Sequence, residues 1–300
     1  MKIAVLSTNT KLYSTKRLVE SISQRGHEAV VINHSLCHVL IEEESPVILY
    51  KNKLIEGIDA IIPRIGASVT DYGSTVVRQF EMMKVFTTVK SQAILRSRNK
   101  LRSLQILSKA GVQIPKTVFA NQTKDIDRLI KLVGGPPVII KLLEGTQGVG
   151  VVLAESNKAA KSTIEAFYGL KTNVLVQEYI EESNGADIRA FVVGNKVVAA
   201  MKRQGVSGDF RSNLHRGGKA EALILQPHEE KAALQAAKAL GVRVAGVDMI
   251  QSNRGPMIME INSSPGLEGI EKITGVNVAD LIIGYIEEKI RADEGDTIGV

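Results

Sequence analysis

The sequence predicts an α/β half with a parallel sheet at the N-terminus, followed by an α+β half. Strand-like and helix-like segments alternate over residues 1 to about 90, and the pattern changes near residue 95. Beyond that point come short strands, glycine-bearing turns, a hairpin and isolated helices. Strand–helix–strand order with short connections favours βαβ units, whereas hairpins mixed with helices favour an α+β layout. We therefore expect one domain over 1–95 and a second over 96–300.

The N-terminal half starts with a short buried strand at 3–6 and a helix with apolar positions at helical spacing over 15–25. A second strand is expected at 28–32, a third at 58–62 and a second helix at 76–85. The first loop after a strand, STNTKLYST, contains no glycine, so the G-x-G-x-x-G fingerprint of a dinucleotide site is missing. The domain is therefore predicted to be Rossmann-like in fold without binding NAD.

The second half opens with a helix over 99–110, which ends at Gly111 in the manner of a helix C-cap. Residues 191–198 have the pattern of a hairpin whose two-residue turn is Gly194-Asn195. Two further helices are expected, at 228–240 and 278–291.

The composition excludes several classes of protein. With 44% apolar residues the chain can build ordinary cores, yet no apolar run approaches the about 20 residues of a membrane helix. Its single cysteine, Cys37, cannot form an internal disulfide. We expect a cytoplasmic protein without a membrane segment. The net charge of +6, from 38 basic and 32 acidic residues, suits an anionic partner such as nucleotide phosphates, an acidic substrate or nucleic acid.

Basic residues crowd one stretch of the chain, where seven Lys and Arg residues occur between Lys84 and Lys109 without one acidic residue. This stretch is either a solvated helix face or a docking surface for something acidic. Trp is absent and aromatic residues make up only 4%, so the chain lacks the aromatic-laced basic stripe that stacks single-stranded bases. Sequence-specific nucleic-acid binding is therefore not expected, although an RNA- or ribosome-binding module without turnover remains an alternative to an enzyme.

A lysine at the end of an apolar strand is the first candidate for chemistry. Lys141 follows three apolar residues, and a lone buried ammonium group is costly unless it has an anionic partner. The next segment, 144–151, carries Gly145, Gly148 and Gly150, whose bare backbone amides can approach phosphate oxygens. No Walker motif G-x-x-x-x-G-K-[ST] occurs in the chain. The alternative is a hairpin with a flexible tip.

The segment VLVQEYI, residues 174–180, is predicted to be a strand that turns polar at its end. The edge of this strand is predicted to present its backbone groups and Glu178 to an adenine base. Most strands of this kind bind nothing, so a purely structural strand is the alternative.

A third strand with polar residues starts at Asp187. Reflection of the following hairpin about its Gly194-Asn195 turn pairs Asp187 with Lys202 and Arg189 with Ala200, on one face of the sheet. A plain cross-strand ion pair between Asp187 and Lys202 is the alternative to a binding role.

The most informative segment is a second hairpin near the C-terminus. Asp248 is the only carboxylate in an apolar strand, and Glu260 and Asn262 lie in the next strand, after a turn that contains Arg254. If the hairpin centres on Arg254, Asp248 faces Glu260, and Asn262 lies two residues further along the same side. Two facing carboxylates repel each other, and a divalent cation resolves that conflict. The oxygen-only ligand set favours Mg²⁺ or Mn²⁺ over Zn²⁺, unless a two-residue turn at Asn253-Arg254 shifts the register.

Residues 203–218 form a glycine-rich, basic segment that contains Arg203, Arg211, Ser212 and Asn213. A loop of this length is uncommon unless it is functional. It is predicted to fold over phosphates or an acidic substrate, and the alternative is a cationic surface loop.

Taken in order, these segments resemble the ATP-grasp superfamily over about residues 95 to 290. The ordered set is Lys100, Lys141 with its glycine loop, QEYI, Asp187, Asp248, Glu260 and Asn262. The segments DIRAFVVG, RSNLHRGG and MEINSSPGLEGIE further resemble the RimK group, α-L-glutamate ligases that modify a small-subunit ribosomal protein. The resemblance implies a Rossmann-like, non-catalytic pre-ATP-grasp domain over 1–95 and an ATP-grasp fold over 96–300, whose two subdomains divide near 180–190.

The resemblance also implies a role for each matching residue. It assigns the nucleotide phosphates to Lys100 and Lys141, with the glycine loop at Gly145, Gly148 and Gly150 as their cover. It assigns adenine to Glu178 and Tyr179, ribose to Asp187, and the phosphate end to Arg211, Ser212 and Asn213. It assigns two Mg²⁺ or Mn²⁺ ions to Asp248, Glu260 and Asn262, with Glu260 bridging. Arg189 and Arg203 are assigned, as catalytic residues, to the acceptor or the acyl phosphate.

The implied reaction adds L-glutamate to the acidic C-terminal tail of a small-subunit ribosomal protein, with poly-glutamate as a further product. A carboxylate would be phosphorylated by ATP to an acyl phosphate, with release of ADP, and the amine of the incoming amino acid would then displace phosphate. The resemblance further implies a homo-oligomer, namely a tetramer. Another ATP-grasp amino-acid ligase, of the lysine-biosynthesis, glutathione or D-alanine type, is the alternative within the enzyme class.

Overall fold

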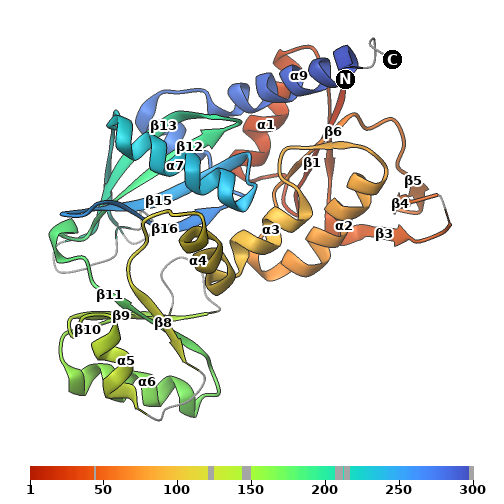
Figure 1. The fold of residues 1–300 in the computed structure, drawn as a ribbon. Coiled ribbons are helices and arrows are strands. Elements are labelled where there is room, and N and C mark those ends of the chain that lie inside the picture. Colours follow the sequence, from red (N-terminus) through yellow and green to blue (C-terminus); the bar gives the residue numbers. More distant parts are fainter. Residues whose placement is uncertain (44, 121–124, 144–149, 207–211, 213–216, 297–300) are drawn as a thin grey trace.

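The structure is a computed structural model that describes residues 1–43, 45–120, 125–143, 150–206, 212 and 217–296. In Figure 1 an N-terminal sheet and a larger antiparallel sheet lie side by side in the upper part of the molecule. A smaller unit of strands and two helices hangs below the larger sheet.

The N-terminal sheet is parallel throughout, which confirms the α/β prediction for this half. Its strands follow the order β2-β1-β6-β7, with β1 (Lys2–Leu6), β2 (Glu28–Ile32), β6 (Ala60–Pro63) and β7 (Phe86–Thr87). Helices α1 (Tyr13–Gln24) and α2 (Thr70–Met82) accompany the sheet. Helix α2 begins six residues before the predicted start, because its first turn is polar and carries Asp71, a charge that favours a helix N-terminus.

A small antiparallel sheet in the same half was not predicted. It consists of β3 (Cys37–Leu40), β4 (Val47–Tyr50) and β5 (Lys53–Leu54), in the order β3-β4-β5. Two short 3-10 turns, η1 (His34–Leu36) and η2 (Ala67–Val69), flank the strands of this half.

The larger sheet is antiparallel and has the order β14-β13-β12-β15-β16. Its strands are β12 (Ala186–Val193), β13 (Lys196–Gln204), β14 (Lys219–Ala222), β15 (Val244–Ser252) and β16 (Gly255–Asn262). Helix α7 (Pro227–Leu240) lies on one face, where Gln251 on β15 donates a 2.7 Å hydrogen bond to Glu229 on the helix. Helices α8 (Glu268–Thr274) and α9 (Val278–Asp296) follow the sheet in the chain.

The smaller unit has a four-stranded sheet in the order β10-β9-β11-β8 and its own apolar core. Its elements are β8 (Thr117–Ala120), α5 (Ile126–Leu132), β9 (Val138–Leu142), β10 (Val151–Ala154), α6 (Asn157–Gly169) and β11 (Val174–Glu178). Two helices, α3 (Ser91–Arg98) and α4 (Lys100–Lys109), lead from the N-terminal sheet toward this unit. A 3-10 turn, η3 (Glu181–Ser183), leads from β11 to the larger sheet.

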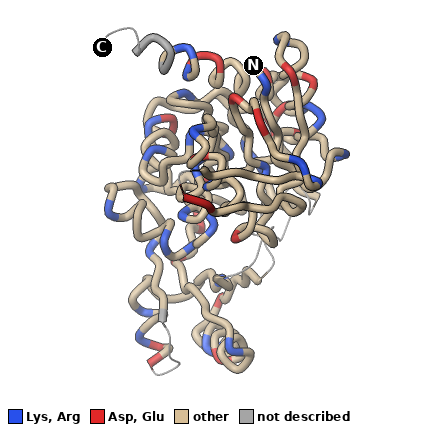
Figure 2. The backbone as a smooth tube through the Cα atoms, turned by 90° about the vertical axis from the view of Figure 1, so that its right-hand side faces the viewer, with Lys and Arg blue, Asp and Glu red and all other residues tan. Residues whose placement is uncertain are grey.

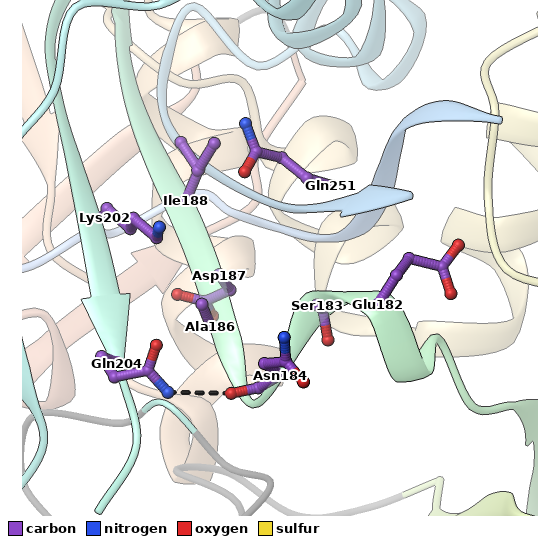
Figure 3. A pocket seen from close by; sticks show the side chains of 9 residues that line it. All are labelled: Glu182, Ser183, Asn184, Ala186, Asp187, Ile188, Lys202, Gln204 and Gln251. Carbon is purple, nitrogen blue, oxygen red and sulfur yellow. Dashed lines mark hydrogen bonds between the residues drawn. The ribbon is translucent and has the colours of Figure 1, made fainter. Parts of the chain in front are cut away.

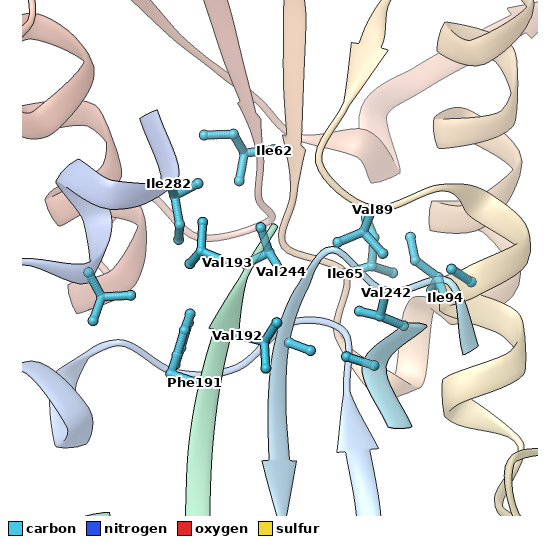
Figure 4. Close-up of a cluster of buried hydrophobic side chains, with 14 of the residues drawn as sticks. Ile62, Ile65, Val89, Ile94, Phe191, Val192, Val193, Val242, Val244 and Ile282 are labelled. Atoms are coloured by element: carbon cyan, nitrogen blue, oxygen red, sulfur yellow. The ribbon is translucent and has the colours of Figure 1, made fainter. Parts of the chain in front are cut away.

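The core of the upper part is continuous across the two sheets. Figure 4 shows Ile62 of β6 next to Val193 and Val244 of the larger sheet, and Ile65 next to Val89 and Val242. Ion pairs outside the core join the same two parts, as in the 2.6 Å contact of Arg25 with Asp280 at the start of α9. The N-terminal sheet and the larger sheet therefore form one packed body.

Charged side chains are distributed over the whole molecule. Figure 2 shows basic and acidic residues interspersed along both the upper body and the lower unit. In the part of the chain that the structure describes, no helix is long and apolar enough to cross a membrane.

Candidate active site

One face of the larger sheet carries a row of charged side chains. Arg203 is the cross-strand partner of Asp187, and Arg189 is the partner of Asp248, which in turn pairs with Glu260. Directly paired residues lie on the same face of an antiparallel sheet, so these five side chains share one face. Helix α7 contacts the opposite face through Gln251, so the charged row lies on the face of the sheet that points away from this helix.

The charged row depends on a bulge between β12 and β13 that the sequence did not reveal. The turn at Gly194-Asn195 has two residues, as predicted, but the register shifts between Phe191 and Val192. The predicted pairing of Asp187 with Lys202 is therefore wrong, and Asp187 faces Arg203. The bulge adds one residue to β13, which brings a guanidinium rather than an ammonium group opposite the carboxylate.

A second bulge, between β15 and β16, determines which candidate metal ligands face each other. The hairpin of β15 and β16 turns through two residues, since Ser252 pairs with Gly255, and this turn alone would place Asp248 opposite Met259. The register shift between Asp248 and Met249 leaves Met259 as the extra residue and restores the pairing of Asp248 with Glu260. The facing carboxylates that the sequence predicted are thus present, but they face each other because of a bulge that the sequence did not reveal.

Asp248 is held by two arginines. Arg189 donates two hydrogen bonds to its carboxylate, at 2.7 and 2.6 Å, and Arg203 lies 2.9 Å from one of the same oxygens. Arg203 also forms a bidentate contact with Asp187, at 2.6 and 2.5 Å. Burial opposes ionisation of Asp248, but the two guanidinium groups outweigh it and lower its pKa to about 2. Asp248 is therefore a carboxylate anion at any physiological pH.

Glu260 is in a different electrostatic position. It forms no hydrogen bond or ion pair with the residues that the structure describes. Its side chain is exposed at the surface of the site, yet partial desolvation by the surrounding protein and then the charge of Asp248 raise the pKa of its carboxyl group. A cation between the two carboxylates would relieve both effects.

The oxygen atoms in this region fit a hard divalent cation. Asp248 and Glu260 share the face with Asn262, whose partner on β15 is Gly246 and whose side-chain oxygen accepts a 2.9 Å hydrogen bond from Ser264 N. Carboxylate and amide oxygens suit Mg²⁺ and Mn²⁺. No group of three or more His, Cys, Asp or Glu side chains with metal-binding geometry occurs in the described ranges. A cation here would therefore need Asn262, water or phosphate oxygens as further ligands.

Lys141 comes from the smaller unit, where it is the second-last residue of β9 and pairs with Leu175 of β11. Its ammonium group donates a 2.7 Å hydrogen bond to Gln177 Oε1, and Gln177 in turn donates to Thr117. Burial lowers the pKa of Lys141 to about 8, while the charge of Glu260 raises it and that of Lys100 lowers it further. Lys141, Lys100 and Glu260 are thus close enough to act on one another, although they come from different parts of the fold.

Lys100 is the first residue of α4, which Asn99 caps by accepting a 2.8 Å hydrogen bond from Arg102 N. Its ammonium group donates to the carbonyl oxygens of Leu142 and Leu143, at 3.1 and 3.0 Å. Lys100 therefore lies beside the end of β9, one residue beyond Lys141.

The predicted adenine contacts lie where β11 leaves the smaller unit. Glu178 accepts a 2.6 Å hydrogen bond from Lys116 N and lies 2.8 Å from Arg254 at the tip of the β15–β16 hairpin. Burial raises the pKa of the neighbouring Tyr179. The carboxylate of Glu178 is thus occupied by protein groups, and its backbone amide donates to the Lys116 carbonyl at 2.9 Å.

Several predicted nucleotide residues lie outside the described residues, namely Gly145, Gly148, Arg211 and Asn213. Ser212 is buried and hydrogen-bonds to the Asp187 carboxylate. Gly150 has a φ of +71°, and a Cβ there would lie 2.5 Å from Leu142. Glycine is therefore required where the chain returns into β10 beside the end of β9.

A pocket of about 220 Å³ lies on the other side of the larger sheet (Figure 3). Ile188, Lys202 and Gln251 line it, and these residues alternate with those of the charged row. Its lining includes Asp187 but not Lys141, Asp248 or Glu260. This pocket is therefore a separate feature from the charged row.

Sequence reasoning missed two kinds of residue at this site. Gln177, the acceptor for Lys141, is 2% exposed, and its signal was a polar residue inside an apolar strand. Arg64 and Arg98 lie near the row without having been singled out, and Arg98 was counted only as part of the basic stretch. The signal for Arg64 was its position directly after a predicted parallel strand, where ligands of such sheets bind.

Comparisons with known proteins agree with this geometry. Residues 97–286 match the model of the RimK-like ATP-grasp domain, and residues 1–94 match that of the RimK PreATP-grasp domain. A "Probable alpha-L-glutamate ligase" of Picosynechococcus is 63% identical over 288 residues, which is 96% of each chain. A protein of the same name from Vibrio cholerae is 57% identical and covers 100% of this chain and 99% of its own length.

Solved structures share the fold at low identity. A RimK domain ATP-grasp protein from Sphaerobacter thermophilus gives a TM-score of 0.72 at 21% identity and covers 95% of this chain and 99% of its own. The D-alanine–D-alanine ligase of Bacillus anthracis gives a TM-score of 0.68 at 20% identity and covers 99% of each chain. With both family models matched along the chain, the protein belongs to the RimK family of ATP-grasp enzymes and is an ATP-dependent acid–amino-acid ligase.

Proposed function

We propose that this ligase adds L-glutamate to the C-terminal carboxylate of an acidic protein tail, that of a small-subunit ribosomal protein, and can extend it to poly-glutamate. The observation that carries the proposal is the pairing of two carboxylates, Asp248 and Glu260, on one face of the larger sheet, where the charge of Glu260 also acts on Lys141. The choice of L-glutamate as the incoming amino acid rests on the relatives, which are named probable alpha-L-glutamate ligases. We place the reaction in the cytoplasm, where ribosomal proteins are found.

The reaction that fits this site proceeds in two steps. An oxygen of the acceptor carboxylate attacks the γ-phosphorus of ATP, and the bond from that phosphorus to the bridging oxygen of ADP breaks. The amine of the incoming glutamate then attacks the acyl carbon, loses a proton, and displaces phosphate as the peptide bond forms. Neither step requires a covalent bond to the protein, so the enzyme acts by positioning and by charge neutralisation.

The side chains divide between the nucleotide, the metal and the acid substrate. We assign the phosphates to Lys100 and Lys141 and the base and ribose to the segment from Glu178 to Asp187. Asp248, Glu260 and Asn262 would hold two Mg²⁺ or Mn²⁺ ions, which neutralise phosphate charge when bound.

Arg189 and Arg203 have an indirect place in the proposed reaction. In the structure they bind the carboxylates of Asp248 and Asp187, so they position these acids. We propose that their remaining N–H groups face the acceptor carboxylate or the acyl phosphate. A guanidinium has five N–H donors, and the contacts described use only some of them.

We also propose that the protein forms a homo-oligomer, a tetramer. Four large apolar side chains of the small N-terminal sheet and its surroundings are exposed, namely Leu36, Leu40, Ile41 and Leu54. Exposed apolar residues that gather in one region favour association. Light scattering of the purified protein tests the stoichiometry.

The proposed activity is tested by measuring ADP release against a panel of amino acids, with and without an acceptor peptide that ends in glutamate. L-Glutamate should give ADP, phosphate and a lengthened peptide. L-Aspartate, one methylene shorter, should be poorer by about 10- to 200-fold. Release of AMP and pyrophosphate would rule out the acyl phosphate, and equal stimulation by lysine, alanine or cysteine would rule out glutamate as the substrate.

A further inference from the structure

The carboxyl edge of the N-terminal sheet contacts the segment that follows the metal candidates. Arg64 directly follows β6 and donates a 2.7 Å hydrogen bond to the Pro265 carbonyl. The amide of Leu267 donates at 3.0 Å to Ser14 on α1. The strand order β2-β1-β6-β7 places neighbours on both sides of β1, and ligands of open parallel sheets bind outside the carboxyl ends at such a point. A ligand position is therefore expected where residues 263–267 meet Arg64.

Two arginines at this junction have no acidic partner. Arg64 donates to the Pro265 carbonyl, and Arg98 donates to the Ile65 carbonyl at 2.6 Å. Neither forms an ion pair with a residue in the described part of the chain. Burial and the charge of Arg98 lower the pKa of Arg64 to about 10, and burial also lowers the pKa of Arg98. Two cations this close in a buried region call for an anion.

Unpartnered polar atoms gather at the same junction. Arg98 Nε, Ser263 Oγ and Ser264 Oγ are buried and have no hydrogen-bond partner among the described residues. Ser263 is only 2% exposed. A buried polar atom without a partner is energetically costly, so several such atoms in one region are unusual unless a ligand supplies their hydrogen bonds.

The junction adjoins the metal face. Ser264 N donates to Asn262 Oδ1 at 2.9 Å, and the charge of Glu260 acts on Arg98. Pro265 packs so closely on Gly246 that a Cβ there would lie 2.9 Å from the proline ring and 3.7 Å from Arg189 Nε. An anion at the junction would therefore lie next to the reacting groups.

We propose that Arg64, Arg98, Ser263 and Ser264 form a subsite for a carboxylate of the acid substrate other than the one that reacts. The subsite offers guanidinium and hydroxyl donors, and a carboxylate has oxygens that only accept, with room for about four hydrogen bonds. This inference rests on the proposed glutamate ligase activity. Two molecules could supply the carboxylate, namely the incoming amino acid and the side chain of the last acceptor residue.

The experiment compares Arg98→Gln and Arg64→Gln with Arg102→Gln as the matched control, because Arg102 lies in the same basic stretch and is exposed. The affinity for ATP is measured first by calorimetry and should be little changed in all three variants. KM for glutamate and KM for the acceptor peptide are then measured separately. Loss of a charged hydrogen bond should raise one of these constants by about 10- to 150-fold in the two test variants and leave it unchanged in the control.

Amide analogues of the two substrates identify which of them supplies the carboxylate. Three compounds each replace one candidate carboxylate by an amide: glutamine, glutamate α-amide and an acceptor peptide that ends in glutamine. The wild-type enzyme should use the compound that lacks the bound carboxylate less well than the parent substrate. Arg98→Gln should lose that discrimination for one of these compounds only. Arg98→Lys should restore part of it, since a point charge remains without the bidentate fork.

The outcomes separate this inference from the activity on which it rests. Failure of wild-type protein to release ADP with glutamate would contradict the proposed function. Normal turnover together with unchanged KM values in folded Arg98→Gln and Arg64→Gln would overturn the subsite alone. If a variant does not fold, thermal stabilisation of wild-type protein by glutarate is compared with that by its monoamide, and equal stabilisation would also overturn the subsite.

Discussion

At the scale of single residues, Lys141 shows how a site can be prepared for an anion. Its ammonium group donates a hydrogen bond to the neutral side chain of Gln177, and burial lowers its pKa to about 8. The acid that acts on it, Glu260, is on another sheet. The residue therefore carries an energetic cost that a bound phosphate would relieve.

Lys141→Met should weaken ATP binding by about 1.5–3 kcal/mol, because a charged hydrogen bond is lost. It should also stabilise the protein without nucleotide at neutral pH. The pKa of about 8 lies below the ordinary 10.5, so protonation is disfavoured in the folded state. The wild-type free energy of unfolding is therefore lowest below pH 8 and rises with pH toward 10.5, and the variant should lack this rise.

Calorimetric unfolding across this pH range tests the stability of the Lys141→Met variant, and titration with ATP tests its affinity. A folded variant with unaltered ATP affinity would remove Lys141 from the nucleotide site.

Glu260→Gln should abolish most turnover, by about 100-fold, because it removes one of two facing carboxylates while leaving the shape of the side chain. Asn262→Asp should retain some activity, since an oxygen ligand remains. Glu268→Gln is the matched control, an acid on α8 whose partner is Lys272 at 2.5 Å. Activity is measured after chelation and on return of Mg²⁺, Mn²⁺ or Zn²⁺, and full activity in a chelated sample would falsify the two-metal scheme.

At the scale of elements, the two hairpins show what a sequence can predict and what it cannot. The strands, the two-residue turn at Gly194-Asn195 and the facing pair of Asp248 and Glu260 followed from alternation and from turn residues. The bulges did not, because an extra residue such as Met259 is apolar like its neighbours and leaves no compositional signal. The predicted pairing of Asp248 with Glu260 is therefore confirmed although the turn differs from the one expected, whereas the predicted pairing of Asp187 with Lys202 is wrong.

The inter-domain contacts were equally hidden from the sequence. Arg64 and Pro265 lie two hundred and one positions apart in the chain and meet only because the two sheets pack together. Local patterns carry no information on such contacts. Motif residues with a chemical signature, such as Lys141 and Asp248, could be selected in advance, whereas arginines at a domain junction could not.

Gly246→Ala should disturb the junction between β15 and the segment after β16. The new Cβ would lie 2.9 Å from Pro265, which has little freedom to move, so the segment must shift. We expect a loss of about 1–3 kcal/mol in stability and a higher KM for the acid substrate. Gly266→Ala is the control, since nothing lies within 4 Å of a Cβ there. Denaturant unfolding and kinetics test both, and equal behaviour of the two variants would contradict the close approach.

At the scale of the whole molecule, the chain divides into a large body and a smaller unit. The smaller unit has a core of its own, and Lys141 belongs to it, whereas Asp248 and Glu260 belong to the large body. Contacts that link the two include the 2.8 Å ion pair of Arg254 with Glu178 and the 2.9 Å hydrogen bond from Asn253 N to Glu182. Such partly exposed contacts are weak, so we expect relative motion of the two parts.

ATP should change the distance between the smaller unit and the large body. Dyes attached at Leu170→Cys and Ile224→Cys, both strongly exposed positions, report on this distance by energy transfer. Dyes at Ile41→Cys and Ile224→Cys are the control, because both positions belong to the large body. Burial raises the pKa of the native Cys37 to about 11, so it should label slowly. A change in the control pair, or none in the test pair, would contradict a moving smaller unit.

The separate core of the smaller unit has a further consequence for how the protein opens. A unit that shares no core with its neighbours can unfold locally while the rest stays native. Backbone amides of β8, β9, β10 and β11 should therefore exchange their hydrogens for deuterium at a lower free-energy cost than those of β1 or β12. The amides of β1 and β12 should exchange together, through one cooperative transition, because a single continuous core holds both sheets.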